Sequence, residues 1–401
     1  MTRQTKILIL TADAGFGHRA AANAVAAALA DRYGDACDTL IANPMNDPRT
    51  PSALRLTQSE HDVMSEQLPQ VYDLGYRVSD RTVSIGAVET ALIAMLYGAV
   101  RDVVEKFKPD AVVSTHPAYQ AAIAAGFALN RHYIPLLLVV TDLAAVHGLW
   151  FNDDVDLCLV PTHVAAARAV QLGIPAESVE VTGLPVNPLF AQPVDKAALR
   201  AELGWSHDRR LVLFAGSKRA HKLEPVADVL NHSGLPIHLA MVAGGHEALL
   251  ESWRGVEWHL PASVYGFVDN MPSMIRAADL IVCKAGGVIT SESMAAGLPM
   301  LLTEIMPGQE AGNAEYVVRG GAGELVSDGV EALRVICHWL EREGSLLAER
   351  AANSRRLGHP EAAGRVAELT WEAAHQGPKP RKHKFLDQVG TLRDILKQRT
   401  T

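Results

Sequence analysis

The chain has 401 residues, a length typical of two domains. Hydrophobic residues make up 48% and charged residues 20% of it, a composition that excludes intrinsic disorder for most of the chain. The formal net charge of −8 argues against a duplex nucleic-acid binder, because such a protein presents a broad basic face.

The first half of the chain alternates short apolar runs with longer alanine-rich stretches. This pattern is typical of parallel strands that are buried on both faces by crossover helices, and it predicts an α/β fold. The expected elements are strands at Ile7–Leu10, Ala111–Ser114, Leu136–Val140, Leu157–Val160 and Val179–Val181, and a helix at Arg19–Asp31.

A glycine-containing turn joins the first strand to the first helix. Residues 14–19 read Ala-Gly-Phe-Gly-His-Arg, and glycines let the backbone approach a ligand that a helix N-terminus can bind. Ala20 replaces the third glycine of a dinucleotide-binding motif, so a nicotinamide or flavin site is a weak interpretation. Imidazoles titrate near neutral pH, so His18 could take a proton from an acceptor hydroxyl. A capping or core histidine is the alternative.

Residues 43–100 do not follow this alternation. Several prolines precede an apolar stretch over Ile85–Val100 that we expect to be helical. We predict a helical insertion packed on the first sheet, with a lipid-acceptor or membrane-facing segment as the alternative.

The alternation also breaks around Gly183. Pro185 and Pro188 cannot continue a central strand or a helix interior, so we predict an N-terminal domain of residues 1–190 and a C-terminal domain of residues 191–375. The second half repeats the pattern, with strands expected at Leu211–Phe214, His238–Val242, Leu280–Cys283 and Met300–Leu302. Two such halves predict two Rossmann-like domains that face each other across a ligand-binding cleft.

A second glycine turn between a predicted strand and a helix begins at Lys284. Residues 284–292 read Lys-Ala-Gly-Gly-Val-Ile-Thr-Ser-Glu, which suits a diphosphate at a helix N-terminus although the P-loop order is absent. Glu292 could accept hydrogen bonds from both hydroxyls of a ribose, or it could be an ordinary first-turn acid. Downstream, Gln309 and Glu310 suit the hydroxyls of a hexose. Together these residues predict a nucleotide-sugar pocket.

Positive charge is concentrated in residues 378–401. This segment has seven basic and two acidic residues, which leaves the rest of the chain at about −13. Its apolar residues recur at near-helical spacing, so we predict a basic amphipathic helix that either binds an anionic membrane or packs on the body of the protein.

Several sequence features concern the cellular compartment. The four cysteines are scattered, which favours a reducing environment. The first apolar run is too short for a signal peptide, and no stretch reaches 18 uncharged apolar residues. We therefore expect a cytoplasmic protein that is peripherally associated with a membrane.

Four segments carry a family resemblance. They read GFGHRAAANAV near the start, TDLAAVHGLWFNDDVDLCLVP from Thr141, VTGLPVNPLF from Val181, and KAGGVITSESMAAGLPMLLTEIMPGQEAGNAEYV from Lys284. They resemble the monogalactosyldiacylglycerol synthase and processive diacylglycerol glucosyltransferase family, which is similar to the enzyme that adds N-acetylglucosamine to lipid-linked muramyl peptide. The resemblance covers most of residues 5–375.

The resemblance implies a fold and a reaction. The fold would be the GT-B type, with two Rossmann-like domains. The reaction would be an inverting, metal-independent transfer of galactose or glucose from a UDP-sugar to diacylglycerol, with the donor bound mainly by the C-terminal half. No acidic pair is placed to hold a metal beside the phosphates, and we expect no cofactor.

The resemblance also implies residue roles. His18 would deprotonate the acceptor, while His116 and Asp142 would line the acceptor side, where Asp142 could orient the base; structural roles for these two are equally compatible with the sequence. The donor-binding residues would be Gly17, Ser217, Phe267, Gly286, Gly287, Val288, Thr290, Glu292, Gln309 and Glu310. Ile289 departs from the family's usual threonine or serine, so the phosphate hydroxyl would move to Thr290 or Ser291 or be missing.

Other functions remain open at the level of sequence. The acceptor could be a soluble aglycone or another lipid. A UDP-sugar 2-epimerase would share the two-domain architecture, and a non-enzymatic nucleotide-sugar-binding subunit is a further alternative. The segment Gly308–Asn313 argues against the epimerase, and His18 argues against the non-enzymatic subunit.

Overall fold

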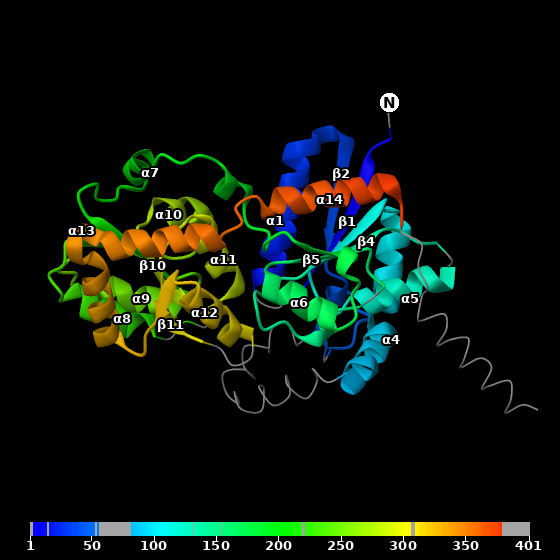
Figure 1. Cartoon of the computed structure of the whole chain (residues 1–401), viewed down its shortest axis with the longest axis horizontal. Helices are drawn as coiled ribbons and strands as arrows, with labels where there is room; N and C mark the ends of the chain where they lie inside the picture. Colours follow the sequence, from blue (N-terminus) through cyan, green and yellow to red (C-terminus); the bar gives the residue numbers. More distant parts are fainter. Residues whose placement is uncertain are drawn as a thin grey trace, which may run out of the picture. The chain divides into compact units, whose positions relative to one another are not determined.

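The chain divides into two compact units. The computed structural model describes residues 3–13, 16–52, 54–55, 82–130, 132–152, 154–218, 220, 222–305 and 309–378. Unit 1 comprises residues 1–185 and 362–401, and unit 2 comprises residues 186–361. Each unit contains a parallel sheet with helices on its faces (Figure 1). The predicted α/β class with two Rossmann-like halves is confirmed.

The described part of unit 1 contains a six-stranded parallel sheet with the order β2-β1-β3-β4-β5-β6. The strands are β1 (Thr5–Leu10), β2 (Cys37–Ala42), β3 (Ala111–Ser114), β4 (Leu136–Val139), β5 (Leu157–Val160) and β6 (Val179–Val181). Alternate residues of β1 enter two different cores, with Leu8 and Leu10 on one face and Ile7 and Ile9 on the other. Because both faces are covered, the central strands appear in the sequence as unbroken apolar runs.

Helices cover both faces of this sheet. On the Leu8 face lie α4 (Thr82–Phe107), α5 (Gln120–Asn130) and α6 (His163–Gln171); on the Ile7 face lie α1 (Phe16–Tyr33) and α14 (Ala362–Gln376). Short 3₁₀ turns connect these elements: η1 (Gly34–Ala36), η2 (Pro44–Asn46), η3 (Gly148–Trp150) and η4 (Ala176–Ser178).

Helix α14 packs on unit 1 although it follows unit 2 in the sequence (Figure 1). The rings of Tyr33 and Trp371 stack with their centroids 3.9 Å apart, and Val366 is buried in the core beneath α1. The predicted C-terminal domain of residues 191–375 therefore needs correction, because unit 2 ends at residue 361. An amphipathic pattern shows that one face of a helix is covered, but it does not show which core covers it.

Helix α4 lies between β2 and β3 in the chain order of the first sheet. It precedes β3, and its residues Leu92, Leu96 and Val100 are buried in the core on the Leu8 face. The stretch at 82–107 is thus a crossover helix of the α/β fold rather than an insertion, because parallel strands need such a connection. The remainder of the predicted insertion, residues 56–81, lies outside the described residues. Among the helices that are described, none is long and apolar enough to span a bilayer.

Unit 2 contains, within its described residues, a second six-stranded parallel sheet with the order β12-β11-β10-β7-β8-β9. The strands are β7 (Arg210–Ala215), β8 (Ile237–Val242), β9 (Ala262–Tyr265), β10 (Leu280–Lys284), β11 (Met300–Glu304) and β12 (Gly323–Leu325). The helical segments are η5 (Pro188–Ala191), α7 (Lys196–Leu203), α8 (Leu223–Asn231), α9 (Glu247–Gly255), α10 (Met271–Ala277), α11 (Gly287–Ala295), α12 (Gln309–Arg319) and α13 (Gly329–Leu357), which is kinked at residues 341–344.

The strand orders locate one ligand-binding edge in each unit. In unit 1 the chain proceeds from β1 to β2 on one side and then to β3 on the other. In unit 2 it proceeds from β7 to β8 and β9, and then to β10 on the opposite side of β7. Ligands of open parallel sheets bind beyond the carboxyl ends of the strands at such a reversal. The relevant loops are therefore those that follow β1 and β3 in unit 1, and those that follow β7 and β10 in unit 2.

Candidate active site

His18 lies at the switch point of unit 1, in the first turn of α1. Its Nδ1 lies 2.9 Å from the carbonyl oxygen of Thr115, which follows β3, and 2.9 Å from the hydroxyl oxygen of Thr141, which follows β4. The Thr115 hydroxyl in turn donates to the His18 carbonyl oxygen over 3.1 Å. Residues from three strand ends therefore fix the position of this ring.

These contacts also determine the tautomer of His18. A carbonyl oxygen can only accept a hydrogen bond, so Nδ1 carries the hydrogen and donates to Thr115. In the neutral ring, Nε2 is then the basic nitrogen. An imidazole with this tautomer can accept a proton at Nε2, which is the property required of a general base.

Asp142 is linked to the region around His18 by the indole of Trp150. Its Oδ2 accepts a 2.6 Å hydrogen bond from Nε1 of Trp150, and the Trp150 ring lies 5.8 Å from the His18 ring, centroid to centroid. Burial raises the pKa of Asp142 to about 6, although the hydrogen bond from Trp150 opposes the shift. The sequence analysis left open whether Asp142 orients the base or has a structural role. The contacts of the Nδ1 of His18 assign that orientation to Thr115 and Thr141.

We predict that Asp142→Asn stabilises the protein at alkaline pH. The pKa of Asp142 in the folded state lies above its ordinary 3.8, so the folded protein favours the protonated carboxyl. The contribution of this group to stability is therefore complete below pH 3.8 and is lost as the pH rises through about 6. Asparagine can still accept from Trp150 without a buried charge. The variant should gain about 2 kcal/mol at pH 8, with little gain at pH 4, in urea unfolding at both pH values. An equal difference at the two pH values would contradict the prediction.

His116 packs against His18. The two rings meet edge to face with centroids 4.7 Å apart. Nδ1 of His116 accepts a 3.3 Å hydrogen bond from the amide of Ala118, so in the neutral ring Nε2 carries the hydrogen. The paired imidazoles thus present different nitrogens: His18 has a basic Nε2, and His116 has an Nε2 that donates.

In unit 2, Gly286 and Gly287 form the turn between β10 and α11. Gly286 is the N-cap of α11 and provides no side-chain cap, so the first amides of this helix have no partner within it. Gly286, Gly287 and Val288 are partly exposed. A Cβ at Gly286 would lie 3.6 Å from Nζ of Lys284, so an ammonium group that is also paired with Glu310 lies beside these amides. Such an arrangement favours a phosphate.

The hydroxyl of Thr290 bonds to the backbone of its own helix. Its side chain is fully buried, and its hydroxyl donates to the carbonyl oxygens of Gly286 over 2.6 Å and Gly287 over 3.0 Å. Threonine in a helix commonly bonds to the carbonyl one turn earlier, and the structure shows this contact for the hydroxyl that the sequence analysis expected at the phosphate. Ser291 is also buried, and its hydroxyl has no hydrogen-bond partner among the described residues.

Two further loops of unit 2 begin at the same edge of the sheet. Gly216 follows β7 and Gly244 follows β8, and a Cβ on Gly244 would lie 2.0 Å from the Gly216 carbonyl oxygen. Gly244 also has a φ of 62°, so both sterics and backbone conformation require glycine here. Ser217 is partly exposed in the first loop. Phe267 follows β9 and is 68% exposed, which is unusual for phenylalanine.

Glu292 is the sixth residue of α11. It is therefore not the first-turn acid that the sequence left as an alternative. Burial raises the pKa of this half-buried carboxyl to about 7. Its carboxyl group forms no hydrogen bond or ion pair with any residue that the structure describes. A carboxylate in this state can accept hydrogen bonds from a ligand.

Helix α12 contributes a polar cluster to the same edge. Glu310 forms an ion pair with Lys284, and both side chains are largely buried. Asn313 donates to the carbonyl oxygen of Ala285 over 3.0 Å, while its Oδ1 is buried without a partner among the described residues. Gln309 begins the helix. The sequence analysis did not assign a role to Lys284 or Asn313, although a cation directly before a glycine turn was a usable signal.

The structure therefore groups the predicted residues into two sets. His18, His116 and Asp142 meet in unit 1, and Gly17 precedes His18 in that unit. The other predicted donor residues lie in unit 2, at the carboxyl ends of β7, β9, β10 and β11. No group of three His, Cys, Asp or Glu side chains that could hold a metal occurs among the residues for which the structure gives positions.

Two family models match the chain. The model described as "Monogalactosyldiacylglycerol (MGDG) synthase" matches residues 18–186, and "Glycosyltransferase family 28 C-terminal domain" matches residues 210–363. The first match contains His18, His116 and Asp142. The second contains the predicted donor-binding residues of unit 2. The recognition made from the four sequence segments is confirmed.

Plant proteins are similar over most of the chain. A probable chloroplastic monogalactosyldiacylglycerol synthase of Glycine max is 30% identical over 385 residues, which are 92% of this chain and 72% of the relative. Monogalactosyldiacylglycerol synthase 1 of Arabidopsis thaliana is 30% identical over 379 residues, with coverages of 91% and 70%.

Solved structures confirm the GT-B fold. MurG of Acinetobacter baumannii superposes with a TM-score of 0.59 at 16% identity, over 92% of this chain and all of that chain. A UDP-N-acetylglucosamine 2-epimerase of Neisseria meningitidis superposes with a TM-score of 0.56 at 14% identity, over 93% of this chain and all of that chain. The fold alone therefore does not separate transferases from epimerases, whereas the family match does. By its sequence similarity over both units, the chain belongs to the monogalactosyldiacylglycerol synthase family of glycosyltransferases.

Proposed function

We propose that this protein transfers galactose from UDP-galactose to the hydroxyl of diacylglycerol, with His18 as the general base. The observation that carries the proposal is the hydrogen bonding of His18, which leaves Nε2 as its basic nitrogen. Membership of the family supports the substrates, because the similar plant proteins are named for this product.

The proposed reaction is a single displacement. The acceptor O–H bond breaks as its proton passes to Nε2 of His18, and the acceptor oxygen forms a bond to the anomeric carbon. The bond from that carbon to the UDP oxygen breaks at the same time, so the configuration inverts and UDP leaves as an anion. His116, as a donor at Nε2, would hold the acceptor oxygen in place.

Unit 2 would stabilise the departing UDP. The amides of Gly287 and Val288 and the ammonium of Lys284 provide positive potential where negative charge develops. Glu292 would accept from the ribose hydroxyls, and Gln309 and Glu310 would bind the sugar. Ser217 and Phe267 would contact the phosphates and the uracil, respectively, and Gly17 would approach the donor from unit 1.

The test is transfer of radiolabel from UDP-galactose and, separately, from UDP-glucose into vesicles that contain diacylglycerol. Labelled galactolipid after lipid extraction is expected from the first donor. Label from UDP-glucose alone would overturn the choice of sugar. Failure to label lipid, together with transfer to a soluble alcohol, would favour the soluble-aglycone alternative. Conversion of UDP-N-acetylglucosamine without an acceptor would favour the epimerase.

Thr141→Val should lower kcat without weakening the binding of the UDP-sugar donor. The Thr141 hydroxyl lies 2.9 Å from Nδ1 of His18, and valine keeps the shape but removes this contact. We expect kcat to fall about tenfold, the factor for one hydrogen bond of about 1.4 kcal/mol, while KM for UDP-galactose is unchanged. Thr141→Ser should restore most of the rate. Equal losses in the valine and serine variants would contradict a role for the hydroxyl.

We propose that residues 378–401 bind an anionic membrane surface and so make the enzyme peripheral. This segment lies beyond the described residues except for Pro378, and its charge supports the proposal, because each Lys or Arg near an anionic leaflet gains about 1 kcal/mol. Sedimentation with vesicles rich in anionic lipid tests it. The full chain should co-sediment at low salt, and a chain that ends at residue 377 should not. Equal sedimentation of both would refute it.

A further inference from the structure

A pocket of about 570 Å³ lies in unit 1, away from the candidate active site. It is lined by α4, by α5 and by residues that directly precede β1, β3 and β4, including Arg3, Asp110 and Ile134. In a parallel sheet these residues mark the amino ends of the strands. His18 follows the carboxyl end of β1. The pocket is therefore at the opposite edge of the sheet from the proposed reaction.

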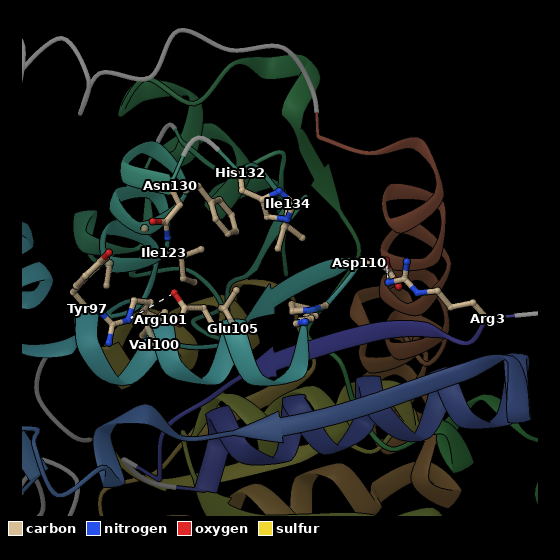
Figure 2. A pocket seen from close by; sticks show the side chains of 16 residues that line it. Arg3, Tyr97, Val100, Arg101, Glu105, Asp110, Ile123, Asn130, His132 and Ile134 are labelled. Carbon is tan, nitrogen blue, oxygen red and sulfur yellow. Dashed lines mark hydrogen bonds and ion pairs between the residues drawn. The ribbon is translucent and has the colours of Figure 1, made fainter.

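The inner surface of this pocket is apolar. Val100 from α4 and Ile123 and Phe127 from α5 are buried in the core, as is Ile134. Figure 2 shows Val100, Ile123 and Ile134 around the same space. The volume falls in the range of pockets that enclose one small molecule. It suits one alkyl chain.

Basic side chains surround the apolar surface. Arg3 pairs with Asp110 over 2.8 Å, and Arg101 lies 3.9 Å from Glu105 (Figure 2). Arg101 also donates to Asp102 over 2.8 Å, so Glu105 has only the longer contact with this guanidinium. Lys108 also lines the pocket and forms no ion pair with any residue that the structure describes. Among the described residues that line the pocket, the ammonium of Lys108 is therefore the cation that no carboxylate pairs with.

The backbone of Lys108 ends helix α4 beside the pocket. Its φ is 54°, in the left-handed region that favours glycine, directly after the end of α4 at Phe107. Its amide donates to the carbonyl oxygen of Val104, which is the usual helix-ending contact of a glycine. Lysine at this position is strained, and such strain tends to occur at functional positions.

We propose that this pocket binds a single-chain amphiphilic anion, with its alkyl chain against Val100, Ile123 and Phe127 and its anionic headgroup on Lys108. Lys108 is exposed at the rim of the pocket, where its ammonium would attract an anionic headgroup and repel a cationic one. A carboxylate and a phosphate both satisfy this chemistry. The proposal is independent of the galactosyltransferase assignment.

Calorimetric titration of the full chain tests the proposal, with decanoate, decyl phosphate and decanol below their aggregation concentrations. Decanoate, decyl phosphate or both should bind more tightly than decanol, and the tighter of the two anions identifies the headgroup. Lys108→Gln should weaken anion binding about tenfold, as expected for one charge-assisted hydrogen bond, and should leave decanol binding unchanged. Lys106→Gln is the matched control, because Lys106 is exposed on the same helix and does not line the pocket.

Gly126→Leu tests the location of the site. The nearest atom to a Cβ at Gly126 is Cε2 of Tyr97 at 3.6 Å, an ordinary contact, so the variant should fold while its side chain fills the pocket. It should abolish binding of all three ligands. Absence of anion binding to the wild type, decanol binding as tight as that of the anions, equal losses in the Lys106 and Lys108 variants, or full binding by Gly126→Leu would each overturn the proposal.

Discussion

His18→Ala is expected to lower the rate of galactose transfer about 10³-fold, within the range for loss of a general base. The acceptor hydroxyl would have to lose its proton to water, whereas in the wild type Nε2 of His18 accepts it. KM for UDP-galactose should change little, because the proposed donor contacts other than Gly17 lie in unit 2. Initial rates at saturating donor, together with calorimetric binding of UDP, separate the two effects.

A second histidine serves as the control for this variant. His163 is exposed in the first turn of α6, so His163→Ala should keep the wild-type rate. His18→Gln is informative as well, because glutamine can occupy the space and donate a hydrogen bond without being a base. If His18→Gln were as active as the wild type, His18 would be a positioning residue and the proposed mechanism would fail.

Most of the strands that were predicted from the sequence are buried on both faces, and the exception is the edge strand β6 (Val179–Val181). β3, β4 and β10 are apolar except for Ser114 and Lys284 at the ends of β3 and β10, and the predicted bounds agree to within a residue. The edge strand β2 was not predicted, because its residues are only partly buried and its sequence, CDTLIA, mixes polar with apolar residues. The edge strand β12 (Gly323–Leu325) was not predicted either, because its three residues, GEL, contain one large apolar side chain.

The site could be predicted where its chemistry is local. The glycine turns and His18 occur at strand-to-helix junctions, and these junctions are visible in the sequence. Contacts between distant residues could not be predicted. The ion pair of Lys284 with Glu310 spans 26 positions, and the carbonyl of Thr115 that orients His18 is 97 positions away from it.

Thr290 illustrates a different limit of sequence reasoning. A hydroxyl near a helix N-terminus is compatible with a phosphate contact and with a hydrogen bond to the preceding turn. The sequence is the same in both cases. The choice depends on the rotamer and on burial of the side chain, which the packing of α11 determines.

Glu292→Gln is expected to weaken UDP binding at pH 8 by about tenfold or more, since hydrogen bonds to a charged group are worth about 1.5–3 kcal/mol. The pKa of Glu292 is raised to about 7 by burial. The carboxylate, which is the form proposed to accept from the ribose hydroxyls, is therefore the main form above pH 7. Affinity of the wild type for UDP should fall as the pH decreases through 7, whereas that of the variant should not follow this titration. Calorimetry at pH 6 and pH 8.5 measures both.

The same variant should be more stable than the wild type at high pH. Because the folded-state pKa of Glu292 lies above its ordinary 4.5, its stabilising contribution is complete below pH 4.5 and is lost as the pH rises through about 7. Glutamine should therefore gain about 2 kcal/mol in urea unfolding at pH 8.5, less at pH 6, while Glu251→Gln, at an exposed position on α9, should change neither property. An acid retained for its favourable interaction with the helix dipole would have a lowered pKa, and its loss would destabilise the fold. A gain in stability together with a loss of UDP affinity would thus identify Glu292 as a ligand-binding residue. A loss of both would reject that role.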